Sequence, residues 1–244
     1  MSTSLNLPAG LAATHVPGRR HRALGALLIF DALLSFAPLV VLGGAIGWPG
    51  SLGKPAAEQL AAIAAAPGGV ALGYGVYLLY SVLIAPVMVG LAARTFGDLR
   101  SPLAATVAAF GALSALARSI GILRWLTVMP LLALAHAAGD GATKAQVALV
   151  FDAVHAYGGG IGEILGVSLF MALAVGLMSI GGRIVGSLPT WLAILGLATA
   201  AALAALAAPA FGLPKFMPVA AAVSLLSAWM LATGVWCLAS ASKK

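Results

Sequence analysis

Charged residues and cysteine are scarce in this chain, and both shortages limit the classes of protein to which it can belong. Only 8% of the 244 residues are charged, and 62% are hydrophobic, whereas an ordinary soluble domain carries about 25% charged residues. Cys237 is the single cysteine, which excludes an internal disulfide and a zinc site built from several thiolates. The composition therefore indicates an integral membrane protein.

Motifs for metals and cofactors are also missing. The sequence has no HExxH, CxxC or EF-hand pattern. The glycine-rich run GGGIGEILG follows no predicted strand, so a nucleotide loop is not indicated. Histidines are too few on one side for a haem cavity, and no lysine lies deep in an apolar run to hold retinal. We expect neither a metal ion nor a cofactor.

Apolar runs of about 20 residues, long enough to cross a hydrocarbon core of about 30 Å, dominate the chain. They predict six spans, at residues 23–47, 70–93, 103–129, 161–180, 188–208 and 217–239. Because these runs lack the alternation of barrel strands, lipid favours a helical bundle. The sequence thus predicts an all-α, polytopic membrane protein. Its single six-helix transmembrane domain, residues 23–240, follows a flexible basic tail at 1–22 and precedes a short tail at 241–244.

The basic residues predict the orientation of the bundle. The net charge of +7 does not indicate nucleic-acid binding, because the cations are scattered rather than gathered on one face. Segments on the side of the N-terminus carry eight basic residues, and those on the opposite side carry three, Lys54, Lys144 and Lys215. The positive-inside bias therefore predicts that both termini are cytoplasmic, and membrane lipids are the expected partners of the basic tail.

Two arginines occur inside the third predicted span. At about 1.5 Å per residue, Arg118 lies about 22 Å from the cytoplasmic start of the span and Arg124 about 31 Å. Arg124 can extend to the interface, but Arg118 is too deep and needs an anion. Glu163, near the outer end of the fourth span, lies at a matching depth. We therefore predict that Arg118 and Glu163 pair below the outer surface.

Residues 147–180 place further groups beside Glu163 when they are read as a helix. Steps of three and four residues put Asp152, His155 and Glu163 on one stripe. A neighbouring row of glycines, Gly158, Gly162 and Gly166, predicts close helix packing. Residues 143–157 are too many for the same crossing, so they either project outward or fold back at a bend in glycines 158–160.

Polar residues of the first two spans need partners as well. Tyr77 and Tyr80 lie in the outer half of the second span and are placed to hydrogen-bond the predicted cluster. Asp31 lies about 12 Å from the cytoplasmic end of the first span and must be protonated, paired or hydrated. Arg94 and Ser35 are its candidate partners.

A family resemblance rests on two motifs. The run RSIGILRWLTVMPLLA and the later run HAYGGGIGEILG resemble a bacterial multi-pass membrane family known as domain of unknown function 4386. The resemblance covers nearly the whole chain and implies a bacterial inner-membrane protein of about six helices, with no established activity. Its motif positions are Arg124, Trp125, Pro130, Tyr157, Gly158, Gly162 and Glu163.

Three functions remain open. The predicted polar cluster consists of Tyr77, Tyr80, Arg118, Arg124, Asp152, His155, Tyr157 and Glu163. It is either a lock between helices or a site for a small anionic ligand, where Glu163 or His155 acts as a base and enzyme activity stays an open question. The glycine row also suits an accessory subunit of a larger complex or a homo-oligomer. A small-solute transporter is the third reading, although interrupted helices at matching positions of two repeats are missing.

Overall fold

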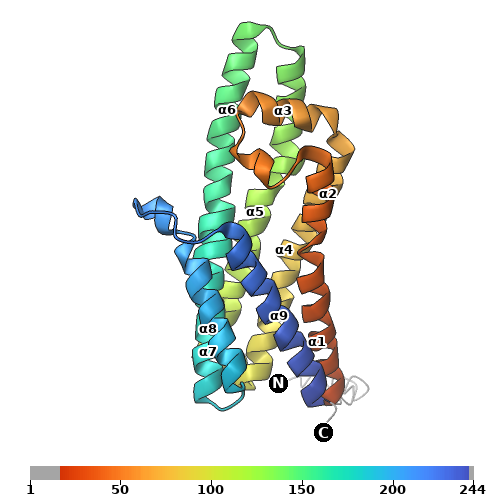
Figure 1. Cartoon of the computed structure of the whole chain (residues 1–244). Helices are drawn as coiled ribbons and strands as arrows, with labels where there is room; N and C mark the ends of the chain where they lie inside the picture. Colours follow the sequence, from red (N-terminus) through yellow and green to blue (C-terminus); the bar gives the residue numbers. More distant parts are fainter. Residues whose placement is uncertain (1–16, 242–244) are drawn as a thin grey trace, which may run out of the picture.

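The computed structural model describes residues 17–241, and almost all of this range is helical (Figure 1). No strand occurs within the range, so the predicted all-α class is confirmed. Most of the two predicted tails, residues 1–16 and 242–244, lies outside the described residues. Residues 17–22 of the N-terminal tail belong to the first helix, α1 (Pro17–Leu34).

Five helical stretches of the described range are long and apolar enough to cross a membrane, and the chain is a multi-pass membrane protein. They are α1 with α2 (Ala37–Ile46), α4 (Pro67–Phe96), α5 (Pro102–Ala138), the run of α6 (Gly141–Gly159), η3 (Gly160–Phe170) and α7 (Met171–Ile184), and α9 (Val219–Ala241). The predicted span at 188–208 is represented by a shorter apolar helix of 16 residues, α8 (Thr190–Ala205). Short elements fill the connections, namely η2 (Gly50–Gly53), α3 (Ala56–Ala65) and η4 (Ala208–Phe211).

Proline and glycine explain where the helices begin and end. Pro67 and Pro102 occupy the first turns of α4 and α5, where a missing N–H costs no hydrogen bond. The first span was expected to be one helix, but it breaks between α1 and α2, because Pro38 has no N–H to donate to the carbonyl of Leu34. Gly47, with a φ of 69°, ends α2 in the left-handed conformation.

The glycines at 158–160 do not bend the chain as one of the two predicted arrangements required. The helix continues from Gly141 to Ile184, and its hydrogen bonding widens to a π-helix over the 11 residues of η3. π-Helical turns are rare and occur frequently at functional sites. The end of α5 and the start of α6 therefore form a straight hairpin that projects beyond the other helices (Figure 1).

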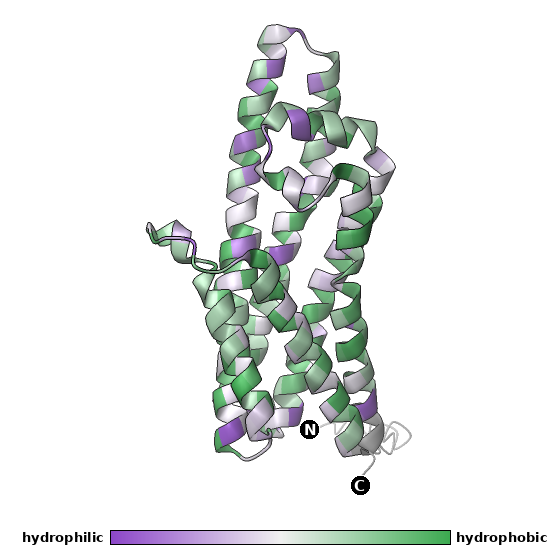
Figure 2. Ribbon diagram, viewed as in Figure 1, coloured by the Kyte–Doolittle hydropathy of each residue, from purple (hydrophilic) through white to green (hydrophobic). Residues whose placement is uncertain are grey.

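The bundle has two distinct ends. α1 begins and α9 ends at the same end, which we call the terminal end, and the α5–α6 hairpin forms the opposite, hairpin end (Figure 1). α5 is the central helix, since α4, α6, η3 and α7 all pack against it, while α9 packs against α1 and α8. Figure 2 shows mainly apolar residues along the middle of α1, α8 and α9, and more hydrophilic residues on α3 and α6 near the hairpin end.

Candidate functional site

Polar side chains gather where two hydrophobic cores meet. The core nearer the terminal end includes Ala115 of α5, and the core nearer the hairpin end includes Ile122 of the same helix. Arg118 lies between these two positions, and Tyr77 of α4 packs against both cores. We call this region the boundary layer. It is the part of the bundle in which the predicted site residues have to be sought.

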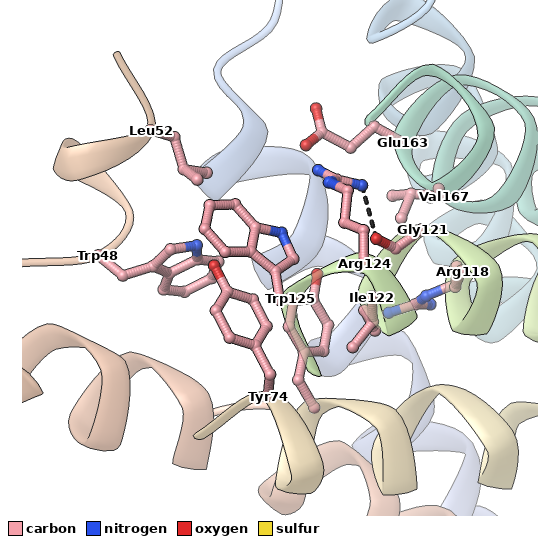
Figure 3. A pocket seen from close by; sticks show the side chains of 12 residues that line it. Trp48, Leu52, Tyr74, Arg118, Gly121, Ile122, Arg124, Trp125, Glu163 and Val167 are labelled. Atoms are coloured by element: carbon pink, nitrogen blue, oxygen red, sulfur yellow. Dashed lines mark hydrogen bonds between the residues drawn. The ribbon is translucent and has the colours of Figure 1, made fainter. Parts of the chain in front are cut away.

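Two cavities open in the boundary layer. The smaller, of about 50 Å³, is lined by Arg118, Arg124 and Glu163 among others (Figure 3). The larger, of about 590 Å³, extends toward α2 and the start of α9. Five wall residues are common to both, namely Trp48, Leu52, Tyr77, Glu163 and Val167. The two cavities are therefore neighbouring parts of one site.

The predicted pair of Arg118 and Glu163 does not form. Within residues 17–241, the salt bridge between side chains is that of Lys54 with Glu58, at 3.7 Å. Arg118 is 3% exposed, and its guanidinium carbon lies 4.5 Å from the ring centre of Tyr80. Its Nε and Nη1 atoms have no hydrogen-bond partner among the described residues.

Glu163 lies on the other side of the small cavity, nearer to Arg124. Arg124 and Lys215 are the cations that act electrostatically on its carboxylate, and Figure 3 shows Arg124 between Glu163 and Gly121. Arg124 donates a hydrogen bond from Nη1 to the carbonyl oxygen of Gly121 at 2.6 Å. The two arginines thus point in different directions from α5, and only Arg124 faces the carboxylate.

Neither predicted partner binds Asp31. Arg94 donates to the hydroxyl of Ser240 at 2.6 Å, and Ser35 donates to the carbonyl oxygen of Ala32 at 2.6 Å. Asp31 is completely buried, and within the described chain both of its carboxylate oxygens are without a hydrogen-bond partner. Arg118 is the charged group that acts on it. The cation that was assigned to Glu163 therefore acts on Asp31 electrostatically, without a hydrogen bond or an ion pair between them.

Aromatic rings hold the hairpin side of the boundary layer. Tyr74 stacks on Trp125 with ring centres 4.7 Å apart, and His155 meets Trp125 edge-on at 5.6 Å. Phe151 stacks on His155 at 5.7 Å. These contacts join α4, α5 and α6, and they leave His155 in the wall of the large cavity.

The remaining predicted residues divide into two groups. Tyr77 lines both cavities and Tyr80 lines the large one. Asp152 and Tyr157 are exposed on α6 and belong to the walls of neither cavity. The structure therefore assembles six of the eight predicted cluster residues around the cavities.

The predicted glycine row lies against α5, with two different roles. A side chain at Gly121 would place its Cβ 2.7 Å from the Cα of Gly162, so backbone meets backbone there. A Cβ at Gly158 would lie 2.6 Å from Cδ of Arg124, and one at Gly166 would lie 2.7 Å from Cγ of Arg118. These two glycines therefore leave room for the arginine side chains.

Several wall residues could not be selected from the sequence. Trp48, which lies in the connection after α2, packs edge-on against Tyr77 at 5.9 Å and lines both cavities. Lys215, in the segment before α9, lines the large cavity. The only sequence signal for Lys215 was its rarity, since basic residues are few in the segments predicted to face outward.

A comparison with protein families decides the relationship of the chain. A family described as Domain of unknown function (DUF4386) matches residues 23–240. The chain belongs to this family. The resemblance predicted from the two motifs is thereby confirmed. No match was found among curated proteins or among solved structures.

The motif residues of this DUF4386 chain concentrate around the small cavity. Arg124, Trp125, Gly162 and Glu163 all line it. Within the described residues, no group of three or more His, Cys, Asp or Glu side chains is placed to hold a metal ion. The site offers instead two arginines, a lysine, a carboxylate and tyrosine hydroxyls, which are groups suited to binding an anion.

Proposed function

We propose that this protein lies in a bacterial inner membrane, with its terminal end in the cytoplasm, and binds a single-chain amphiphile with an anionic head group. The large cavity is the observation that carries the proposal. Its volume of about 590 Å³ falls within the range of about 300–1,000 Å³ that is typical of ligand pockets. The cytoplasmic assignment is supported by the distribution of basic residues.

The walls of the large cavity suit a ligand with one apolar and one charged part. Apolar side chains from α2, η3 and α9, such as Leu39, Ile164 and Val223, form much of the surface. His155, Glu163 and Lys215 also belong to the wall, and Lys215 acts electrostatically on the carboxylate of Glu163. Apolar walls with a few polar groups are the usual design of pockets that bind and orient small molecules.

The charge of the site favours an anion. Arg118, Arg124 and Lys215 line the two cavities, against the single carboxylate of Glu163. Arginine binds phosphate and carboxylate groups with paired hydrogen bonds, and buried Nε and Nη1 of Arg118 have no partner within the described chain. An anionic head group at the small cavity would supply acceptors for these donors.

Entry from the lipid is consistent with the rim of the large cavity. Phe36, Leu39 and Val219 belong to its walls and are at the same time 43%, 44% and 46% exposed. These residues come from the start of α2, its first turn and the start of α9. A hydrocarbon chain can therefore pass between α2 and α9 without crossing water.

The alternative role of a helix lock is weakened by the geometry. A lock through a buried ion pair requires Arg118 and Glu163 to meet, and they do not. The contact between α5 and η3 is made instead by the backbones at Gly121 and Gly162. Packing of these helices thus needs neither charged group.

Quenching of tryptophan fluorescence tests the proposal. Trp48 lies in the walls of both cavities, so a lysophosphatidylglycerol with a brominated chain should quench its emission in nanodiscs. The matched lysophosphatidylcholine should bind more weakly, because its head group has no net charge. The Trp48→Phe variant should lose the saturable part of the quenching. Equal, unsaturable quenching by both lipids would show contact with bulk lipid only and would contradict the proposal.

A charge variant sharpens the same experiment. Lys215→Gln should weaken binding of the anionic probe about threefold to tenfold, since a charge-assisted hydrogen bond at a partly hydrated site contributes about 1 kcal/mol. Lys144→Gln is the control, because Lys144 is an exposed lysine at the start of α6 and lines neither cavity. Equal affinities of the two variants would exclude Lys215 from the head-group site.

A second candidate function is an accessory subunit of a membrane complex. The projecting hairpin carries large exposed apolar side chains, among them Leu131, Leu134 and Leu149, which are 66%, 65% and 72% exposed. Such side chains are common at interfaces between proteins. Native mass spectrometry of the protein released from membranes tests this role, and a lone monomer would count against it.

A further inference from the structure

The environment of Asp31 suggests how ligand binding is controlled. Asp31 lies 10 residues after the start of the apolar stretch at His21, about 15 Å along the helix from that start. Its side chain is completely buried, and neither oxygen has a hydrogen-bond partner among the described residues. A carboxylate in this setting must be balanced by a cation or carry a proton.

The groups around Asp31 provide one cation. From α5, Arg118 acts on Asp31 electrostatically. From α4, Tyr77 and Tyr80 act on Arg118 in turn. α9, which packs along α1, contributes the hydroxyl of Ser227, which lies beside the hydroxyl of Ser35. Arg118 is therefore shared between Asp31 on one side and the small cavity, which it lines, on the other.

Serine hydroxyls of the large cavity lie close to Asp31 along α1. Ser35 follows Asp31 by one helical turn, and its hydroxyl lies 2.9 Å from that of Ser227. Both serines and Tyr80 belong to the walls of the large cavity. The wall of the large cavity thus reaches α1 one helical turn beyond Asp31, although neither hydroxyl bonds to the carboxylate.

We propose that Asp31 is a proton-binding site, and that its protonation releases Arg118 to bind the anionic head group of a ligand. When Asp31 is ionised, its charge offsets that of Arg118 and repels an anion beside this guanidinium. A proton from the cavity that binds a carboxylate oxygen removes this negative charge. The anion then takes its place, so that one proton and one monovalent anion enter together and the charge of the layer is conserved.

This inference rests on the proposed function, and binding measured against pH tests it. The probe is the brominated lysophosphatidylglycerol, whose phosphodiester keeps its charge between about pH 5 and pH 8. Because one linked proton changes the affinity by up to about tenfold per pH unit, the wild type should bind more tightly as pH falls. Asp31→Asn, which resembles the protonated state, should bind tightly at every pH.

Other titratable groups of the cavity need controls. His155 and Glu163 also line it, so Glu163→Gln and His155→Gln should keep the dependence on pH. A dependence that persists in Asp31→Asn and disappears in either control would overturn the proposal. Saturable binding that does not change with pH would also overturn it, while leaving the proposed function intact. No saturable binding at any pH would contradict the proposed function itself.

Infrared spectroscopy measures the proton on Asp31 without a ligand. The wild type minus Asp31→Asn difference should contain the carbonyl band of a protonated carboxyl group, and this band should shift in heavy water because the proton exchanges. If Asp31→Asn does not fold, modification of the wild type by dicyclohexylcarbodiimide replaces the difference spectrum, since this apolar reagent attacks protonated carboxyl groups. Absence of the band, or an unmodified Asp31 beside a modified Glu163, would overturn the proposal.

Discussion

Gly121 of α5 is the position where one added methyl group should disturb the bundle most clearly. The Cβ atom of an alanine there would lie 2.7 Å from the Cα of Gly162 and 2.9 Å from the carbonyl oxygen of Gly158. Both neighbours are backbone atoms, so no side-chain rotation can relieve the contact. α5 and η3 would have to move apart.

The expected size of the effect follows from two opposing terms. Overpacking of a tight contact costs about 1–3 kcal/mol, and replacing glycine by alanine inside a helix returns about 1 kcal/mol. Gly121→Ala should therefore lower the free energy of unfolding by up to about 2 kcal/mol. Gly162→Ala should cost less, because its Cβ would lie 3.2 Å from the Cα of Gly121.

Gly160 provides the matched control in the same segment. No atom lies within 4 Å of a Cβ at this position, and its φ of −56° suits any residue. Gly160→Ala should therefore be neutral or slightly stabilising. Titration of the three variants with denaturing detergent, followed by tryptophan fluorescence, measures the order. Identical unfolding midpoints for all three would refute the close contact between α5 and η3.

Two further predictions concern the two ends of the bundle. Asp140 accepts a hydrogen bond from the backbone N–H of Thr143, which lowers the pKa of Asp140. The stabilisation from this helix cap should therefore be present above the ordinary pKa of about 3.9 and be lost as pH falls through the lowered value. Amide-exchange protection at Thr143, compared between the wild type and Asp140→Ala, measures this loss. The guanidinium of Arg94 lies over the ring of Trp236, 4.4 Å from the ring centre, so Arg94→Gln should lower the free energy of unfolding by about 1 kcal/mol. Arg100→Gln, at an exposed position, should not lower it. Equal midpoints of the two variants in thermal unfolding would disprove the contact.

The membrane class and most spans could be predicted because run length and hydropathy are properties of local sequence. The same reasoning predicted longer and more continuous helices than the structure has. The run at 23–47 passed for one helix because its composition is uniformly apolar, although Pro38 divides it. The run at 188–208 was predicted to be a full span, because the length of an apolar run counts residues whether or not they are helical. Helix α8, however, ends at Ala205.

The two residues that were predicted to pair, Arg118 and Glu163, both line the small cavity but do not form an ion pair. Rise per residue places Arg118 and Glu163 at similar depth, but depth does not determine direction around a helix axis. Six residues separate Arg118 from Arg124, which turns them about 120° apart. Arg124 is the one that faces the Glu163 carboxylate, whereas Arg118 lies beside Gly166, one turn further along η3. The electrostatic effect of Arg118 on Asp31 depends on where α1 packs against the other helices, which the amino-acid sequence does not show.

Helix α8 has a consequence for the surrounding bilayer. Its 16 residues measure about 24 Å, which is about 6 Å less than a typical hydrocarbon core. Lipids in contact with this flank must compress their chains, and such hydrophobic mismatch costs a fraction of a kcal/mol per Å. Phe211 and Phe216, which are 69% and 65% exposed in the segment after α8, add apolar surface at this end of the helix. The thickness of the membrane therefore changes the free energy of the contact between lipid and α8, on the flank beside the mouth of the large cavity.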